Sequence, residues 1–211
     1  MDKSLIDELA RREVPVVFLD SGAAGLHMSN LRVGYAEGIK QAILHLVELG
    51  HTNVAFISGL PHLRSAKRRL EAFRQTMKAV LPDAPEQVYE GDFKIEGGRR
   101  AALEILAAFE SPTAVVAAND LMAFGAISEF RRAGLNVPRD ISVIGFDDIA
   151  FSSLIEPALT TVNLPLGELG RLAVEALLTT LSSPTQHGIE LLIPTRLIVR
   201  NSTAAARIGK L

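Results

Sequence analysis

Short apolar runs alternate with longer amphipathic segments along most of the chain. Four runs, at residues 14–19, 54–58, 114–118 and 141–146, are apolar almost throughout and do not alternate with polar positions. Continuous runs of this kind are typical of strands in a parallel sheet that helices cover on both faces. Weaker strands are predicted at residues 88–89, 160–164 and 191–199, the last interrupted at Pro194.

The segments between these runs carry apolar residues at helical spacing. Residues 35–49 are the clearest case, because Ile39, Ile43 and Leu46 fall on one face and Gly50 follows as a stop signal. The same spacing predicts further helices at residues 2–12, 65–80, 95–109, 121–133 and 167–181, with a single turn at 151–155. Residues 21–32 and 182–188 are predicted loops. The alternation of strands and helices indicates an α/β fold.

Polar residues stand at the ends of two of the predicted strands. The run 114–118 leads into Asn119-Asp120, and the run 141–146 leads into Asp147-Asp148. A strand–helix–strand unit places both carboxyl ends at one edge of the sheet, where open α/β sheets bind ligands. We therefore expect Asn119 and Asp147 to face one crevice, with donors and acceptors suited to a hydroxyl-rich small molecule.

These polar residues also have simpler interpretations. Asp120 is as well suited to cap the following helix as to bind a ligand, which leaves Asn119 freer to meet one. Asp147 and Asp148 could together bind Mg²⁺. Adjacent side chains at a strand end usually diverge, however, so one could face the crevice while the other stabilises the loop. Asp20, after the run 14–19, is either a turn residue or a hydroxyl acceptor on the opposite wall of the crevice.

A basic run lies on the predicted helix 65–80. Lys67, Arg68, Arg74 and Lys78 are expected on its solvated face, whereas Arg69 is flanked by apolar residues on the inner side. An inward guanidinium offers a rigid fork of donors for paired hydroxyls or a carboxylate. The five histidines show no metal-ligand spacing, and His51 is expected to close the preceding helix.

Composition narrows the possible functions. The chain has 211 residues, 48% of them hydrophobic, with a formal net charge of −2 and no cysteine. The hydrophobic content predicts a sizeable core, and the net charge gives no sign of a basic surface that would bind nucleic acid. The absence of cysteine excludes disulfides and Cys-based metal sites. The first residues lack the apolar run of a signal peptide, and the sequence shows no membrane-spanning run, phosphate-binding loop or nucleophile motif. A cytoplasmic protein without a cofactor is therefore expected.

A series of motifs runs in order along nearly the whole chain. They are Leu49-Gly50-His51, Val54 to Gly59, Arg69-Leu70 with Phe73, Pro112-Thr113-Ala114, Ala118-Asn119-Asp120, Val137 to Asp148, Leu159 to Val162, and Val199-Arg200 with Ser202-Thr203. Together they resemble the effector-binding part of the lactose-repressor (LacI/GalR) family of bacterial transcription regulators.

The resemblance implies a periplasmic-binding-protein-like fold with two Rossmann-like subdomains, each built on a parallel sheet. The chain is expected to pass between the two subdomains three times. The expected N-terminal subdomain is truncated, and residues 1–33 plus 165–185 form its remnant. Residues 34–162 plus 189–202 are expected to form the C-terminal subdomain, and residues 203–211 a tail. The DNA-binding headpiece of the family is expected to be absent from this chain.

The resemblance also implies a function. A small-molecule effector, expected to be a carbohydrate, would bind between the subdomains, and their closure would modulate DNA binding in the intact homodimer. The ligand-binding residues would be Asp20 on the N-terminal side and Ser65, Arg69, Asn119 and Asp147 on the C-terminal side. Sugar-stacking aromatics are scarce, since the chain has no Trp and two Tyr. The alternatives are a solute-binding module without DNA function and a Mg²⁺-dependent enzyme on a doubly wound sheet.

Overall fold

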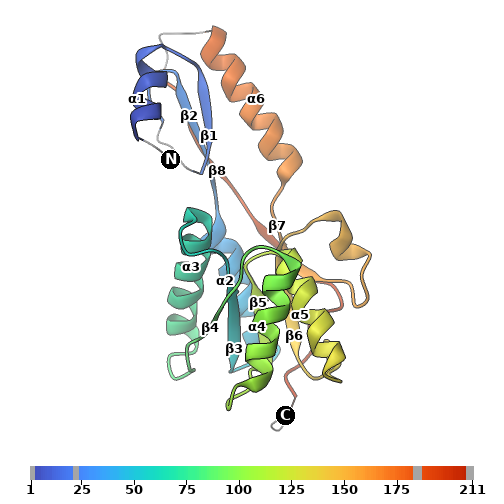
Figure 1. The fold of residues 1–211 in the computed structure, drawn as a ribbon. Helices are drawn as coiled ribbons and strands as arrows, with labels where there is room; N and C mark the ends of the chain where they lie inside the picture. Colours follow the sequence, from blue (N-terminus) through green and yellow to red (C-terminus); the bar gives the residue numbers. More distant parts are fainter. Residues whose placement is uncertain (1–2, 21–23, 183–186, 208–211) are drawn as a thin grey trace. The chain divides into compact units, whose positions relative to one another are not determined.

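The computed structural model describes residues 3–20, 24–182 and 187–207. The chain forms two compact units, residues 1–34 with 165–195 and residues 35–164 with 196–211, so it passes between them three times. Each unit contains a parallel sheet with helices (Figure 1). The predicted α/β fold class is thereby confirmed, and the two units are described separately below.

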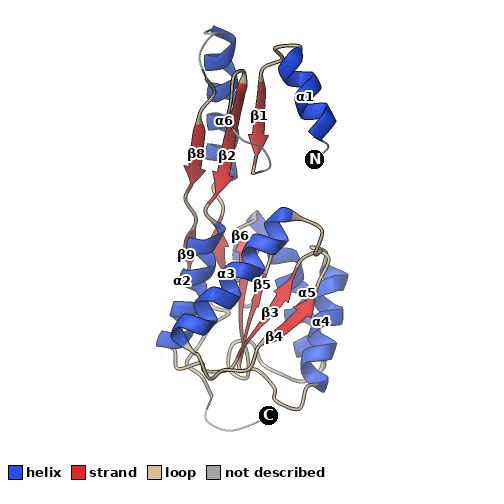
Figure 2. Ribbon diagram, turned by 90° about the vertical axis from the view of Figure 1, so that its left-hand side faces the viewer, coloured by secondary structure: helices blue, strands red, loops and turns tan. Residues whose placement is uncertain are grey.

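The larger unit is built on a six-stranded sheet in the order β4-β3-β5-β6-β7-β9, parallel except for β9, which runs antiparallel to β7. Its strands are β3 (Val54–Ser58), β4 (Gln87–Glu90), β5 (Ala114–Ala117), β6 (Ser142–Asp147), β7 (Thr160–Asn163) and β9 (Arg196–Ile198). Its helices are α2 (Tyr35–Glu48), α3 (Arg64–Val80), α4 (Ile95–Ala107), α5 (Asp120–Arg132) and the short 3-10 helix η1 (Ala150–Ser153). Figure 2 shows α2 and α3 on one face of the sheet and α4 and α5 on the other.

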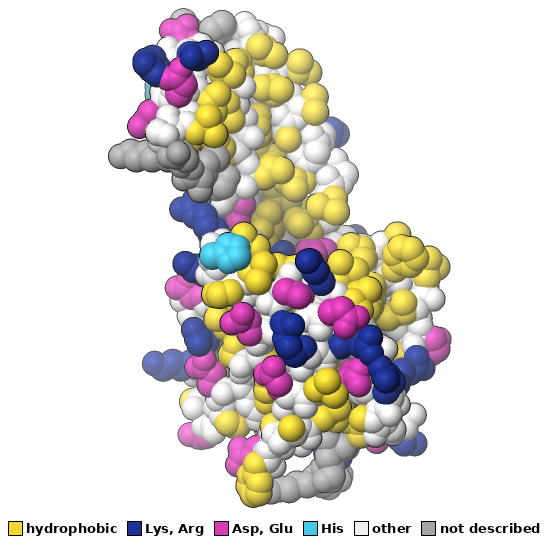
Figure 3. Space-filling model, in the orientation of Figure 1, with side chains coloured by type: hydrophobic (Ala, Val, Ile, Leu, Met, Phe, Trp, Pro, Cys, Tyr) yellow, Lys and Arg dark blue, Asp and Glu magenta, His cyan; other side chains and the backbone are white. Residues whose placement is uncertain are grey.

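The central strands of this sheet explain the continuous apolar runs. Every residue of β3 and β5 is buried, because helices cover both faces. The outer surface of the helices is charged, and Figure 3 shows acidic and basic side chains interspersed over the face formed by α4 and α5. Among the described residues, no helix is long and apolar enough to cross a bilayer.

The smaller unit has a three-stranded parallel sheet in the order β1-β2-β8. Its elements are α1 (Lys3–Arg11), β1 (Val16–Leu19), β2 (Met28–Val33), α6 (Leu166–Ser182) and β8 (Glu190–Ile193). Leu31 and Ile193 lie at the centre of its core, and Leu169 and Ala176 are the apolar residues that α6 buries. The other side of α6 exposes Val174, Leu178 and Leu181 (Figure 3).

Two sequence predictions about the smaller unit are wrong. β2 lies in a segment that was predicted to be a loop. The strand was missed because its sequence, Met-Ser-Asn-Leu-Arg-Val, has no apolar pattern. Ser29 is nonetheless accommodated, since its hydroxyl accepts a hydrogen bond from the Ile189 amide at 3.1 Å. The predicted strand 191–199 is in fact two strands, with β8 beside β2 and β9 beside β7.

Because the predicted strand 191–199 is divided at Pro194, the boundary between the two subdomains differs from the predicted one. Residues 189–195 were expected in the C-terminal subdomain, but they belong to the smaller unit, because β8 completes its sheet. The expected tail also differs in part, since the Ala206 amide donates to the Leu49 carbonyl at 2.8 Å and holds this segment against α2. Residues 208–211 of that tail and residues 183–186 of a predicted loop lie outside the described residues.

Helices α4 and α5 approach so closely that two glycines are required between them. A Cβ atom on Gly98 would lie 2.0 Å from the Met122 carbonyl oxygen, and one on Gly125 would lie 2.0 Å from the Ile95 carbonyl oxygen. Both distances are well inside van der Waals contact, and both obstacles are backbone atoms that cannot rotate away. The two helices therefore depend on glycine for their packing.

We expect Gly125→Ala to lower the free energy of unfolding of the larger unit by about 1–3 kcal/mol, the usual effect of overpacking. Denaturant unfolding followed by circular dichroism measures this change. Gly170→Ala in α6 is the control, because no described atom lies within 4 Å of its Cβ position. That control should stabilise by up to about 1 kcal/mol through helix propensity. Equal stability of the two variants would contradict the close-packing interpretation.

Candidate functional site

The buried guanidinium of Arg69 is the centre of the candidate site. Arg69 lies on α3 and is 5% exposed. Its Nη1 donates to the Ala118 carbonyl at 2.8 Å, and its Nη2 donates to Asp147 Oδ1 at 3.2 Å. Ala118 follows β5 and Asp147 ends β6, so Arg69 joins α3 to the carboxyl ends of two neighbouring strands. Within the described residues, Nε is buried and has no hydrogen-bond partner.

Three aromatic rings surround this guanidinium. Its central carbon lies 4.2 Å from the ring centroid of Phe146, 4.6 Å from that of Tyr35 and 5.7 Å from that of Phe93. The faces of aromatic rings attract cations, and the attraction grows when water is excluded. The rings therefore stabilise the charge while fixing the plane of the guanidinium.

Asp147 is the acidic partner. Its side chain is 26% exposed, and it has a φ of +109°, a conformation that costs a non-glycine residue energy and that needs support from the surrounding structure. Burial raises the pKa of Asp147 to about 6, although the Arg69 charge lowers it, and the Asp120 carboxylate raises it further. A carboxylate with one oxygen on Arg69 and an exposed remainder can accept hydrogen bonds from a ligand's hydroxyl groups.

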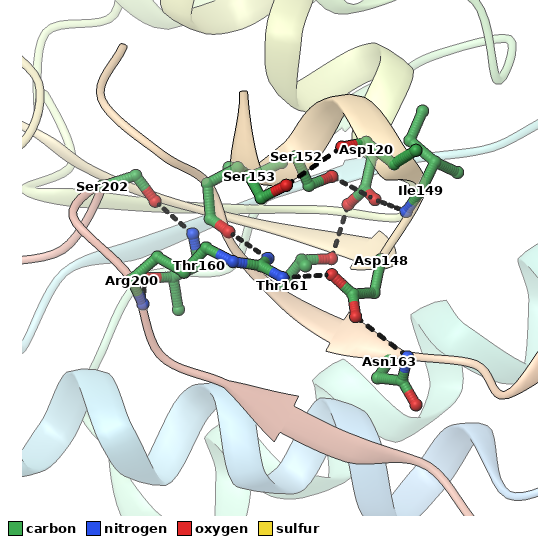
Figure 4. A network of polar contacts seen from close by, with 12 residues as sticks. Asp120, Asp148, Ile149, Ser152, Ser153, Thr160, Thr161, Asn163, Arg200 and Ser202 are labelled. Atoms are coloured by element: carbon green, nitrogen blue, oxygen red, sulfur yellow. Dashed lines mark hydrogen bonds and ion pairs between the residues drawn. The ribbon is translucent and has the colours of Figure 1, made fainter. Parts of the chain in front are cut away.

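Asp148 has a different role, as expected for an adjacent residue at a strand end. Its Oδ1 accepts from Arg200 Nη2 at 2.7 Å and its Oδ2 accepts from Asn163 Nδ2 at 2.9 Å. Figure 4 shows these contacts beside those of Asp120. The two aspartates therefore do not present paired carboxylates to a cation. Across the described residues, no group of three His, Cys, Asp or Glu side chains could hold a metal ion.

Asp120 fixes the loop that follows Asp147. It is fully buried and accepts hydrogen bonds from the Ile149 amide at 2.9 Å, the Ser152 hydroxyl at 2.8 Å and the Thr161 hydroxyl (Figure 4). Burial raises the pKa of Asp120, and these three donors lower it. Asp120 thus ties β7 and η1 to the start of α5, which sets the position of the segment that carries Asp147.

The interpretation of the Asn119-Asp120 pair needs correction. Asn119, not Asp120, is the N-cap of α5, and its Oδ1 accepts from the Met122 amide at 3.0 Å. Its Nδ2 donates to the Phe93 carbonyl at 3.0 Å, so Asn119 is not free to meet a ligand as predicted. The helix begins one residue earlier than predicted, which exchanges the roles of the two side chains. Asn119 instead holds Phe93 close to Arg69.

The remaining predicted site residues lie in different places. Ser65 is half-buried on α3, four residues before Arg69 and so on the same face of the helix. Asp20 belongs to the smaller unit, where it follows β1 with a φ of +58° and its Oδ1 accepts from the Val33 amide at 3.3 Å. The larger unit thus brings Arg69, Asn119 and Asp147 together, with Ser65 one helical turn from Arg69.

The aromatic residues were missed by the sequence analysis. Tyr35 begins α2, Phe93 follows β4 and Phe146 lies in β6, so no local pattern relates them. The structure shows that Gly59 lies against one of them, since a Cβ atom there would lie 2.1 Å from the Phe93 ring. This glycine makes room for Phe93, which itself has a φ of +65°.

The prediction for His51 is incomplete: its amide donates to the Leu46 carbonyl at 3.0 Å and so closes α2, but its ring has another role. The ring is buried and contacts the Thr113 hydroxyl at 2.8 Å and the Ala204 carbonyl at 3.0 Å. Burial lowers the pKa of His51, so the neutral ring is favoured. Its contacts bind the C-terminal segment to the amino edge of the sheet, away from the strand ends that carry the candidate site.

Known proteins of one family are similar to this chain in sequence and fold. Residues 43–203 match the family of periplasmic binding protein-like domains. Over 97% of its length, the chain superposes on a dimeric lac repressor lacking 11 C-terminal residues, with a TM-score of 0.86 and 32% identity, and it covers 74% of that chain. The chain belongs to the LacI family.

Other LacI-family members are similar over almost the whole chain. A LacI family transcriptional regulator from Enterococcus faecium, solved with bound ribose, has a TM-score of 0.90 and 29% identity, and the match covers 98% of this chain and 77% of that one. The probable HTH-type transcriptional repressor ExuR of Bacillus subtilis is 34% identical over 96% of this chain. The chain spans 61% of that repressor's length, less than two thirds.

The raised pKa of Asp147 predicts a pH-dependent stability. A carboxyl with a pKa near 3.8 when unfolded and about 6 when folded stabilises the fold below pH 4, and this contribution is lost as pH rises through 6. The free energy of unfolding of the wild type, relative to that of Asp147→Asn, should therefore fall by up to about 3 kcal/mol from pH 4 to pH 7. Urea titrations at several pH values measure it, and parallel curves for the two proteins would refute it.

Proposed function

We propose that this chain is the effector-binding portion of a LacI-type transcriptional regulator and that its effector is a carbohydrate. The observation that carries the proposal is the Arg69–Asp147 pair, held at the carboxyl edge of a parallel sheet among three aromatic rings. Ligands of open α/β sheets bind at this edge. The Enterococcus relative with bound ribose supports the choice of a carbohydrate.

The chemistry of the pair suits neighbouring hydroxyl groups. Arg69 can donate to the oxygen of one hydroxyl, and the Asp147 carboxylate can accept the proton of the next, both through charge-assisted hydrogen bonds. The guanidinium is already fixed by Ala118 and the surrounding rings, so little side-chain entropy is lost on binding. Phe93, which is half-buried, would meet a C–H face of the sugar, whereas the buried rings of Tyr35 and Phe146 would hold the guanidinium in place.

The other predicted residues enter the proposal with smaller roles. Ser65 would offer a hydroxyl to the ligand one turn from Arg69, whereas Asn119 would act by holding Phe93 in place. Asp20 stays a prediction of the sequence for the smaller unit. In the intact protein, proposed to be a homodimer with a DNA-binding headpiece, the effector would bind one conformational state more tightly and so change the affinity for DNA.

A thermal-shift screen tests the proposal directly. The purified chain is heated with pentoses, hexoses, disaccharides, sugar acids, purines, Mg²⁺ and nucleotides. A ligand at one hundred times its Kd stabilises the folded protein by about 2.7 kcal/mol, which gives a clear shift. A shift with one class of carbohydrate supports the proposal. A shift with Mg²⁺ or nucleotides alone would overturn it in favour of a different chemistry.

We expect Arg69→Met and Asp147→Ala each to weaken binding of the effector found in this screen by about 1.5–3 kcal/mol, because each removes a hydrogen bond to a charged group. Isothermal titration calorimetry measures the change. Lys67→Met is the control, since this exposed lysine lies on the same helix outside the site. Unchanged affinity in both site variants, with their folding verified by circular dichroism, would refute the assignment.

A further inference from the structure

A hollow in the larger unit lies at the carboxyl end of α3, among residues that take no part in the Arg69 site. It has a volume of about 310 Å³ and is formed by the last turns of α3 and the loop that leads to β4. Small-molecule sites in proteins have volumes from about 300 Å³ upward, so this hollow is large enough for a small ligand.

The floor of this hollow is apolar and rigid. Phe73 and Met77 lie four residues apart on one face of α3 and are 1% and 8% exposed. The Phe73 ring stacks on Phe56 of β3 with 4.8 Å between centroids and 21° between planes, which fixes its orientation. The opposite wall carries Pro82 and Pro85, whose fixed φ angles restrict the loop. The hollow is therefore formed before any ligand arrives.

The rim of the hollow carries one cation that no acidic side chain neutralises. Arg74 is paired with Glu86 across the rim, with Nη2 and Oε1 2.7 Å apart, and this ion pair ties the loop to α3. Lys78 also lines the hollow, and among the described residues it forms no ion pair. Its place in the last turn of α3 gives it a favourable interaction with the helix dipole, but that interaction does not account for the apolar floor beside it.

We propose that this hollow binds a small apolar carboxylate. The hydrocarbon body would pack against Leu81, Pro82 and Pro85 above the buried floor, and the carboxylate would pair with the Lys78 ammonium. A neutral hydrocarbon would leave the cation without a partner, and a polyol would gain little from the apolar floor. An inorganic anion would contact Lys78 alone, so an amphipathic monoanion uses both features best.

Octanoate is the probe that tests the proposal, and 1-octanol, which has the same body without the charge, is its comparison. Titrations followed by amide NMR should shift signals of the α3 carboxyl end and of Ala84. We expect 1-octanol to bind more weakly than octanoate, and Lys78→Gln to weaken octanoate binding about three- to fivefold, as exposed charge pairs do. The same variant should leave 1-octanol binding unchanged.

Two further variants keep the test decisive. Ala84→Leu fills the hollow from its wall and should reduce the binding of both probes. Lys67→Gln removes an exposed lysine of the same helix outside the hollow and should affect neither probe. Equal affinity for octanoate and 1-octanol, equal effects of the two lysine variants, or no octanoate binding below about 10 mM would overturn the proposal.

Discussion

The removal of the Arg69 charge from water constrains much of the larger unit. A buried guanidinium must be paired and hydrogen-bonded, because an isolated charge in the interior costs several kcal/mol. Here the carbonyl after β5, the carboxylate at the end of β6 and three aromatic rings supply what water would otherwise give. The relative positions of α3, β5 and β6 at this edge of the sheet therefore cannot vary without exposing or isolating the charge.

The core of the sheet could be predicted from sequence because its signal is local. β3, β5 and β6 are continuous apolar runs, and burial on both faces is what such runs require. β2 could not be found in this way, since Ser29 and Asn30 are buried polar residues, and the partner of the Ser29 hydroxyl, the Ile189 amide, comes from a distant part of the chain. Likewise β8 and β9 appear as one segment in the sequence, and only their different partner strands separate them.

Part of the candidate site could also be predicted, because two of its residues have a local signal in the sequence. Arg69 and Asp147 stand out in their own segments, one as a basic residue on an apolar face and the other as an acid at a strand end. Asn119 and Asp120 have nearly equal capping tendencies, so a difference of one residue in the start of α5 was enough to exchange their roles. Tyr35, Phe93 and Phe146 come from three distant segments, and only the folded chain brings them around one guanidinium.

The geometry of the site also depends on residues that no ligand would touch. Asp147 and Asp148 have φ values of +109° and +55°, and two such residues in succession need support from their surroundings. Arg200 and Asn163 hold Asp148, while Asp120 holds the next residue through the Ile149 amide. Because these contacts fix the backbone on the far side of Asp147, they determine where its carboxylate lies. Polar residues behind the site therefore contribute to its chemistry by restricting the position of the one acid that faces Arg69.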